Sequence, residues 1–209
     1  MIENTHMIGL GRWLKTTTLC LALTLNFQSF AQDEQSYSIG DKVEPFSLPN
    51  AYGQMINAFD NDSKGYIIVF TNQQCSYVNL YESRIQALDT KYREMGYPLI
   101  AIEAEIESFE LSTSALPDYI KKNAITYDYL IDMDNSISKS FQVQSSPQAL
   151  ILVRTTDGLR LIYSGSIDNN SRRPASVTRK YIEEAMDDIL ANRTLRQPQT
   201  KSIGCHITY

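Results

Sequence analysis

The sequence has little histidine and little cysteine. Among 209 residues the histidines are His6 and His206, and the cysteines are Cys20, Cys75 and Cys205. Three cysteines are too few for a small scaffold held by disulfides, and two histidines do not make a multi-histidine metal site. Basic residues are outnumbered, 19 against 24 acidic ones, and the net charge of −5 argues against a nucleic-acid-binding surface. Nine glycines and seven prolines leave no room for a long low-complexity linker.

Residues 1–31 have the plan of a secretory signal peptide. A short basic region holds Arg12 and Lys15, an uncharged apolar stretch follows over 19–25, and a small-x-small cleavage signal lies at 29–31. The apolar stretch is too short to span a membrane, so we expect no stable membrane anchor. The sequence therefore predicts an exported protein, periplasmic or extracellular, that is cleaved after the leader.

Cleavage leaves few residues for chemistry. The exported chain loses Cys20, His6 and the single tryptophan, and keeps Cys75, Cys205 and His206. An oxidising compartment allows the two remaining cysteines to pair. Three outcomes stay open: a structural disulfide, a redox-active disulfide, or a free Cys205 beside its histidine. These three side chains are too few for a metal site, so no metal and no cofactor is expected.

The hydrophobic pattern predicts an α/β domain. Continuous apolar runs indicate strands buried on both faces, and three- and four-residue spacing indicates helices. The alternation predicts a central mixed β-sheet with helices on both faces and an N-terminal hairpin. The expected strands are 66–70, 99–102, 127–131, 149–153 and 159–163, and the expected hairpin is 46–58. One expected helix begins at Cys75, and three others cover 117–123, 136–141 and 176–190.

An acidic stretch follows the second of these strands. Glu103, Glu105, Glu107 and Glu110 lie within eight residues. We interpret them as a solvated loop that leads to a helix beginning at Pro117, because proline is favoured in the first turn of a helix.

This order resembles the thioredoxin-like superfamily, with Cys75 at the start of the first long helix and Ser146-Pro147 before a strand. Within it the chain is similar to the redoxin branch, which groups alkyl hydroperoxide reductase and thiol-specific antioxidant relatives with thiol-disulfide oxidoreductases. The resemblance divides the chain into a signal peptide (1–31), a thioredoxin-like domain (32–191) and a C-terminal tail (192–209). Its local matches are Val69-Phe70-Thr71-Asn72-Gln73-Gln74-Cys75-Ser76-Tyr77-Val78, which is similar to a Cys-Asn-His-Cys-Pro-Tyr-Val pattern, residues 163–170, and Gly204-Cys205-His206-Ile207.

The chain departs from the pattern at its first cysteine. Asn72 occupies that position, and Ser76 replaces the proline after the second cysteine. An asparagine cannot attack a disulfide, so ordinary dithiol cycling within this motif is excluded. Asn72-x-x-Cys75 also resembles the Thr-x-x-Cys turn of peroxiredoxins, with an amide donor in place of the hydroxyl. The peroxiredoxin proline seven residues before the cysteine is Ile68 here.

The resemblance implies a role for five residues. Cys75 would be the reactive thiol, because the first turn of a helix favours a thiolate. Asn72 would be its neighbour in the turn, and Cys205 would be a possible resolving cysteine. Ser146 and Pro147, the latter as a cis-proline, would bind an extended substrate.

Two functions remain open from the sequence. The first is an exported redox protein, a thiol-disulfide oxidoreductase or a peroxiredoxin-like antioxidant that acts through Cys75 on a thiol/disulfide protein or a peroxide. The alternative is a binding module that kept the fold and lost catalysis, with Asn72 as the sign of that loss. The oligomeric state is left open.

Overall fold

The computed structural model describes residues 36–60, 62–104 and 109–209, with the backbone alone over 109–114. The expected signal peptide, 1–31, lies outside the described residues. Within the described part, no helix is both long and apolar enough to cross a membrane.

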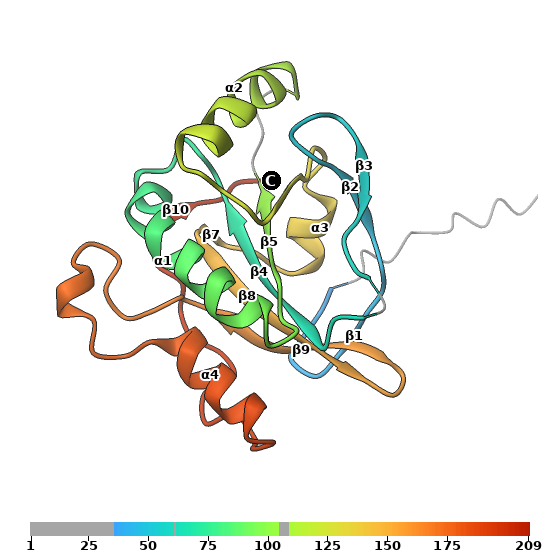
Figure 1. The fold of residues 1–209 in the computed structure, drawn as a ribbon, viewed down its shortest axis with the longest axis vertical. Coiled ribbons are helices and arrows are strands. Elements are labelled where there is room, and N and C mark those ends of the chain that lie inside the picture. The colour runs from blue at the N-terminus through green and yellow to red at the C-terminus, as the bar shows by residue number, and fades with distance from the viewer. Residues whose placement is uncertain (1–35, 61, 105–108) are drawn as a thin grey trace, which may run out of the picture. The chain divides into compact units, whose positions relative to one another are not determined.

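A mixed sheet forms the centre of the domain, as predicted, and it has six strands, of which β1 was not predicted (Figure 1). Its strand order is β1-β9-β8-β4-β5-β6, and β4, β5 and β6 are parallel while β8, β9 and β1 add antiparallel pairs. The strands of the described part are β1 (Lys42–Val43), β2 (Ser47–Pro49), β3 (Met55–Asn57), β4 (Gly65–Thr71), β5 (Leu99–Glu103), β6 (Asp128–Ile131), β7 (Ser145–Ser146), β8 (Gln148–Thr155), β9 (Gly158–Gly165) and β10 (Cys205–His206). All the residues of β4 and β5 are buried, because the sheet is covered on both faces.

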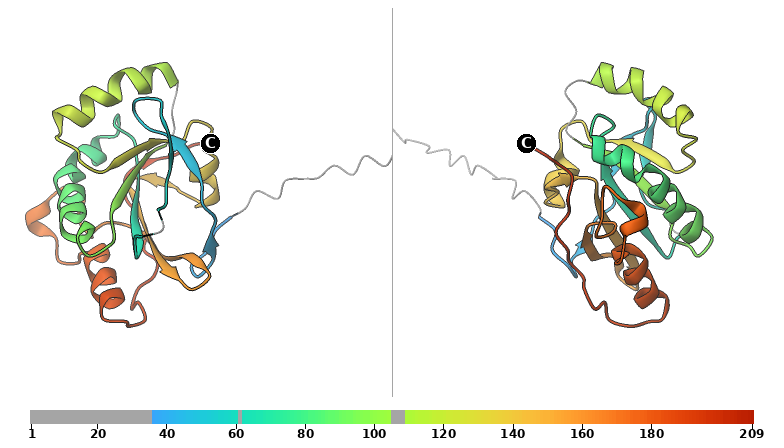
Figure 2. Two further views of the ribbon diagram at one scale, coloured as in Figure 1. Left: turned by 45° about the vertical axis from the view of Figure 1, so that its right-hand side comes forward. Right: turned by 90° about the vertical axis from the view of Figure 1, so that its left-hand side faces the viewer.

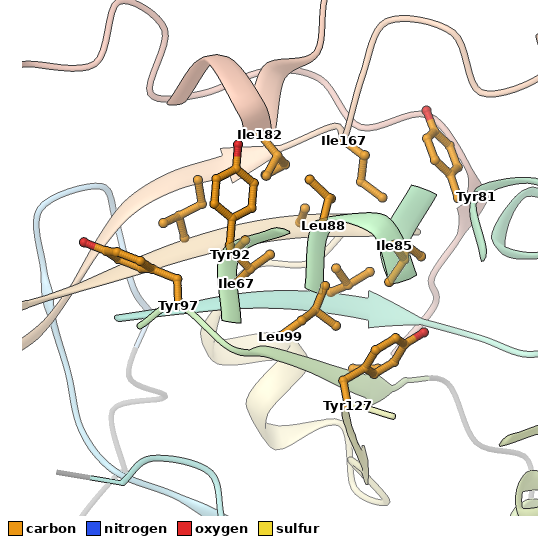
Figure 3. Close-up of a cluster of buried hydrophobic side chains, with 14 of the residues drawn as sticks. Ile67, Tyr81, Ile85, Leu88, Tyr92, Tyr97, Leu99, Tyr127, Ile167 and Ile182 are labelled. Atoms are coloured by element: carbon orange, nitrogen blue, oxygen red, sulfur yellow. The ribbon is translucent and has the colours of Figure 1, made fainter. Parts of the chain in front are cut away.

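Helices cover both faces of the sheet. They are α1 (Ser76–Arg93), α2 (Phe109–Lys122), α3 (Ser136–Ser140) and α4 (Tyr181–Leu190). Successive residues of β4 point to opposite faces, so Ile67 belongs to one apolar cluster and Ile68 to the other. The first cluster packs α1, α2 and α4 against the sheet, with Leu88 and Ile182 among its members (Figure 3). The second cluster is closed by α3 and the β2–β3 hairpin (Figure 2).

Three boundaries differ from the sequence prediction. The helix α2 begins at Phe109 and holds Pro117 in its interior. The sequence prediction started it at the proline because the Ser- and Thr-rich stretch before Pro117 hides the helical spacing. The helix α4 begins at Tyr181, five residues later than predicted. The amides of Thr178 and Arg179 donate to the Asn169 Oδ1 instead of starting the helix. Glu103 is the last residue of β5, not part of a loop.

The tail returns to the main sheet and then to the edge strand β7. The Ser164 amide donates to Pro198, and the Thr200 amide donates to Ser164, so this part of the tail runs along the end of β9. Further on, β10 pairs antiparallel with β7, and Figure 1 shows it in red near the start of α1. The carboxyl end of β4, the start of α1 and the tail therefore meet at one place.

Candidate functional site

A disulfide joins the start of α1 to the C-terminal tail. Cys75 and Cys205 have an S–S distance of 2.01 Å and a Cα–Cα distance of 6.0 Å across a sequence separation of 130 residues. Cys75 is the N-cap of α1 and is 4% exposed, while Cys205 is half-buried. The structure therefore has the two cysteines paired, which agrees with two of the three outcomes left open by the sequence, a structural or a redox-active disulfide, and not with a free Cys205.

The tail adds a short strand beside the disulfide. Cys205 pairs with Ser146 and His206 pairs with Ser145 in the β10–β7 ladder. The Gln144 carbonyl accepts the Ile207 amide at 3.1 Å and lies 3.0 Å from the His206 Nδ1, which therefore carries the proton. The side chain of His206 is thus turned toward Gln144 while Cys205 reaches toward α1.

The loop between β7 and β8 faces the same disulfide. The Ser146–Pro147 peptide bond is cis, which confirms the conformation predicted for Pro147. The Ser146 carbonyl oxygen lies 3.3 Å from the Cys75 sulfur, so it can accept a hydrogen bond from the reduced thiol. The Ser146 hydroxyl is buried and has no hydrogen-bond partner within the described residues.

Asn72 shapes the turn that leads into α1. Its backbone carbonyl accepts the Cys75 amide at 2.9 Å, and its Oδ1 accepts the Gln74 amide at 2.9 Å. Its Nδ2 donates to the Ala104 carbonyl at 3.4 Å, which ties the turn to the residue after β5. An asparagine commonly makes such contacts with the backbone two residues ahead. The structure brings Asn72, Cys75, Ser146, Pro147 and Cys205 together.

A buried acidic side chain contacts this turn. Glu103 is 3% exposed, and its carboxylate accepts the Gln73 amide at 2.9 Å and the Tyr129 hydroxyl at 2.6 Å. Burial raises the pKa of Glu103, and these two hydrogen bonds partly oppose the rise. The predicted solvated loop is therefore wrong for this residue. The available signal was its position directly after the apolar run 99–102, because a strand buried on both faces continues through it.

The electrostatics at the start of α1 favour an anion. The first turn, residues 76–79, carries no acidic side chain, and a helix N-terminus has a partial positive charge. Arg172 adds a cation nearby, because its Nη2 donates to the Tyr77 hydroxyl at 3.0 Å and its guanidinium lies 5.7 Å from the Tyr77 ring. Arg172 lies 95 residues from Tyr77 along the chain, so no local sequence pattern indicates this contact. Arg84 is held elsewhere, at 2.6 Å from Asp168.

The described residues contain no group of three or more histidine, cysteine, aspartate or glutamate side chains placed to hold a metal ion. The two sulfurs of the site are bonded to each other. What this arrangement can do chemically is exchange a disulfide: one sulfur lies where a helix stabilises a thiolate, and the other lies on a terminal strand.

Known proteins share part of this sequence pattern. The "Thiol-disulfide oxidoreductase ResA" of Bacillus cereus is 22% identical over 126 residues, which cover 60% of this chain and 70% of that protein. The protein of the same description from Bacillus anthracis is 21% identical over 126 residues, with the same coverage of both chains.

Solved structures cover more of the chain. An uncharacterized conserved protein from Geobacillus kaustophilus has a TM-score of 0.72 and 24% identity, covering 83% of this chain and 93% of that one. A hypothetical protein from Sinorhizobium meliloti 1021 has a TM-score of 0.71 and 25% identity, covering 84% and 96%. A putative thiol:disulfide interchange protein DsbE from Chlorobium tepidum has a TM-score of 0.56 and 18% identity, covering 75% and 98%. These similarities show the thioredoxin-like fold.

A family model matches a long continuous segment of the chain and not just a single motif. The model of the AhpC/TSA family matches residues 39–159, more than half of the chain, and this segment includes the Asn72–Cys75 turn and the Ser146–Pro147 loop. The chain is therefore a thioredoxin-like redoxin and belongs to the AhpC/TSA family.

Proposed function

We propose that this protein is an exported thiol-disulfide oxidoreductase whose redox-active pair is Cys75 and Cys205. One observation carries the proposal: the disulfide joins a sulfur at the start of a helix to a sulfur on a terminal strand. The tail then supplies the second thiol of the pair, since Asn72 stands where the motif has its other cysteine. The Bacillus relatives described as thiol-disulfide oxidoreductases support the same reaction class.

The reaction is an exchange of two electrons with a thiol/disulfide protein. In the reduced chain the Cys75 thiolate attacks one sulfur of a client disulfide, and the other client sulfur leaves as a thiolate. The Cys205 thiolate then attacks the Cys75 sulfur of the mixed disulfide. This step restores the Cys75–Cys205 bond and releases the client as a dithiol. An external dithiol protein must reduce the chain again for turnover, and the reverse sequence oxidises a client.

The start of α1 supports this assignment of roles. The developing charge on Cys75 lies at the positive end of a helix dipole, with no acidic side chain in the first turn. A helix N-terminus makes a cysteine a good leaving group because its field stabilises the departing thiolate, and it aids attack by raising the fraction of the cysteine that is thiolate. Asn72 and Ser146 act as positioning residues here: Asn72 holds the turn, and Ser146 presents its carbonyl to the Cys75 sulfur.

The test is a redox titration of the folded protein. We expect the Cys75–Cys205 bond to open and close reversibly in dithiothreitol without denaturant, with both thiols then alkylated and identified by mass spectrometry. Cys75→Ser is expected to abolish exchange with a disulfide substrate, and Cys205→Ser to trap a mixed disulfide on Cys75. A bond that opens only in denaturant would overturn the proposal and leave the alternative, a binding module with a structural disulfide.

Peroxide reduction is a second candidate, favoured by the AhpC/TSA family match over the Cys75 turn. The Cys75 thiolate would attack one peroxide oxygen to give a sulfenic acid and an alcohol or water. The Cys205 thiol would then condense with the sulfenic acid to form the disulfide and release water. Ile68 stands where peroxiredoxins have a proline, so we expect this activity to be the weaker one. Trapping of a sulfenic acid in Cys205→Ser by dimedone, with steady peroxide consumption by the wild-type chain when dithiothreitol is supplied to reduce the disulfide after each turnover, tests it.

Export rests on the leader pattern of residues 1–31 and on the disulfide, since disulfides persist mainly in oxidising compartments. N-terminal sequencing of the protein from its host is expected to begin at Gln32. A chain that keeps residues 1–31 and remains in the cytosol would contradict this part of the proposal.

A further inference from the structure

We infer that a client segment which docks on β7, beside the Ser146–Pro147 loop where the resemblance places an extended substrate, has the form Gly-Cys-x-aliphatic, and that the tail of this chain is the internal competitor for that site. The inference rests on the proposed function, because it names the class of client that reaches Cys75. The Gly204-Cys205-His206-Ile207 segment occupies the edge and shows which side chains it accepts.

The edge is the route to the sulfur. Cys75 is 4% exposed, its sulfur is bonded to Cys205, and the Ser146 carbonyl lies 3.3 Å from it. A client cysteine that forms a disulfide with Cys75 must therefore take the place of Cys205. Its neighbours along the chain then take the places of Gly204 and His206 and pair with β7, because main-chain hydrogen bonds can add a strand to an open sheet edge.

The residue before the cysteine must be glycine. A Cβ on Gly204 would lie 2.0 Å from the Ser146 carbonyl oxygen, 2.5 Å from the Ser146 carbonyl carbon and 3.0 Å from the Pro147 nitrogen. All three are backbone atoms held by β7 and β8, so no side chain can turn away to make room. A client with any larger residue at this position cannot come as close to β7 as the tail does.

The second residue after the cysteine must be aliphatic. Ile207 is 2% exposed and belongs to the apolar cluster that also holds Phe141 and Val143, while its amide donates to Gln144. Alternate residues of an extended segment share a face, so the side chain two positions after the cysteine enters this cluster. The residue between them is exposed, as His206 is, and the single side-chain contact described for His206, with the Gln144 carbonyl, lies at the surface, so other side chains fit there as well.

Upstream of the glycine the site is roomier. Ser202 accepts a hydrogen bond from the Ser145 hydroxyl at 2.6 Å and donates to the Gln148 Oε1 at 3.1 Å. A cavity of about 710 Å³ borders this part of the tail and reaches Gln142 and Tyr37. A client side chain larger than serine therefore fits at this position. Specificity is concentrated at the glycine and the aliphatic residue.

Contacts of Thr200, outside the docking site, keep the tail near Cys75 after a client has bound. The Thr200 side chain accepts the Ser166 amide at 2.9 Å and contacts the Tyr163 hydroxyl at 2.7 Å, away from the disulfide. A Cβ on Gly165 would lie 2.1 Å from the Thr200 Oγ1, so the glycine permits this close approach. Anchored there, Cys205 stays close to the edge, and its attack on Cys75 displaces the client from β7.

The test measures how fast peptides form a disulfide with Cys75 in the reduced, full-length Cys205→Ser protein. The parent peptide has the sequence of residues 201–209, Lys-Ser-Ile-Gly-Cys-His-Ile-Thr-Tyr, with its cysteine activated as a 2-thiopyridyl disulfide. Two matched peptides change its glycine to alanine or its second isoleucine to asparagine. The parent is expected to react at least about tenfold faster than either, because the alanine overlaps backbone atoms and the asparagine buries an unpaired amide.

A second variant tests whether the chain's own tail competes with the peptide. Adding Gly204→Ala to Cys205→Ser unseats the chain's own tail, so the parent peptide is expected to react faster with the double variant. The small reagent 2,2′-dithiodipyridine serves as a control for thiol reactivity. If it reacts but the three peptides do not differ, the inference is overturned and the proposed function stands. If Cys75 reacts with neither reagent in the folded protein, both fall.

Two further readouts separate docking at the edge from misfolding and from bonding between copies. Circular dichroism and the unfolding midpoint confirm that each variant folds, and the same peptides are run on the reduced wild-type chain, in which the order of rates is expected to be the same. Reoxidation of the wild-type chain is expected to give monomers with an internal bond. Cys75–Cys205 bonds between two copies would make a second copy the occupant of the edge and would overturn the inference.

Discussion

Removing the bond between Cys75 and Cys205 is expected to lower the free energy of unfolding strongly. The bond closes a loop of 130 residues, and the loss of chain entropy for that length corresponds to about 5 kcal/mol in the unfolded state. The bond's Cα–Cα distance of 6.0 Å lies in the usual range for disulfides. The Cys205→Ser variant is the simplest perturbation, because residue 205 is half-buried and its hydroxyl can reach water.

The assay is urea unfolding of the wild-type chain, with and without reductant, and of Cys205→Ser. With a slope of about 2 kcal/mol per molar urea, a loss of about 5 kcal/mol lowers the midpoint by about 2.5 M. The corresponding fall in Tm is about 10–20 °C for a domain of this size. Reduced wild type and Cys205→Ser are expected to agree, and reductant is expected to leave the variant unchanged.

A loss below about 1 kcal/mol in both reduced forms would refute the reasoning. It would mean that closing a loop of 130 residues removes little chain entropy from the unfolded state, or that the tail can leave β7 at no cost to the rest of the fold. A loss seen in Cys205→Ser but not in reduced wild type would instead assign the effect to the substitution itself.

Three other changes are predicted from the site and its surroundings. Gly204→Ala is expected to raise the reduction potential of the disulfide by about 40–60 mV, because overlap with Ser146 disfavours the closed tail by roughly 2–3 kcal/mol; titration against glutathione measures it, and an unchanged potential would contradict the steric argument. Glu103→Gln is expected to flatten the pH dependence of stability. Since burial raises the pKa of Glu103, wild-type stability is fully present below the ordinary glutamate pKa and falls as pH rises through the raised value, whereas the amide does not titrate; urea midpoints at about pH 5 and pH 8 that shift equally in both proteins would count against it. Arg84→Met is expected to cost about 3–5 kcal/mol by leaving the buried Asp168 carboxylate without its cation, while the exposed control Arg172→Met costs under about 1 kcal/mol; equal midpoints in urea would show that the buried pair contributes nothing.

The sequence predicted the elements whose burial leaves a periodic trace. The strand β4 is an unbroken apolar run because both of its faces are covered, and α1 places Val78, Ile85 and Tyr92 on one buried face. The cis bond before Pro147 followed from the resemblance rather than from periodicity, and the structure confirms it.

What the sequence did not reveal depends on contacts between distant segments. The strand β10 is two residues long, too short for any period, and its position is set by pairing with β7 and by Gly204. Glu103 was misplaced because charge suggests solvent, whereas two hydrogen-bond donors make its burial tolerable. Arg172 reaches Tyr77 only through the fold, so no local pattern indicated a cation near α1.

The replacement of the first cysteine by Asn72 changes what a redox step does to this molecule. In a Cys-x-x-Cys pair both sulfurs lie in one turn, so opening the bond leaves the backbone where it is. Here the second sulfur lies on β10, and opening the Cys75–Cys205 bond removes the covalent tie that holds a strand on β7. The remaining contacts that hold the tail near the bond include the β10–β7 pairing, the Gln144 contacts, the Ser202 hydrogen bonds and the burial of Ile207. Electron transfer and access to the β7 edge are therefore coupled: the oxidised chain covers its own docking edge, and the reduced chain can offer it to a client.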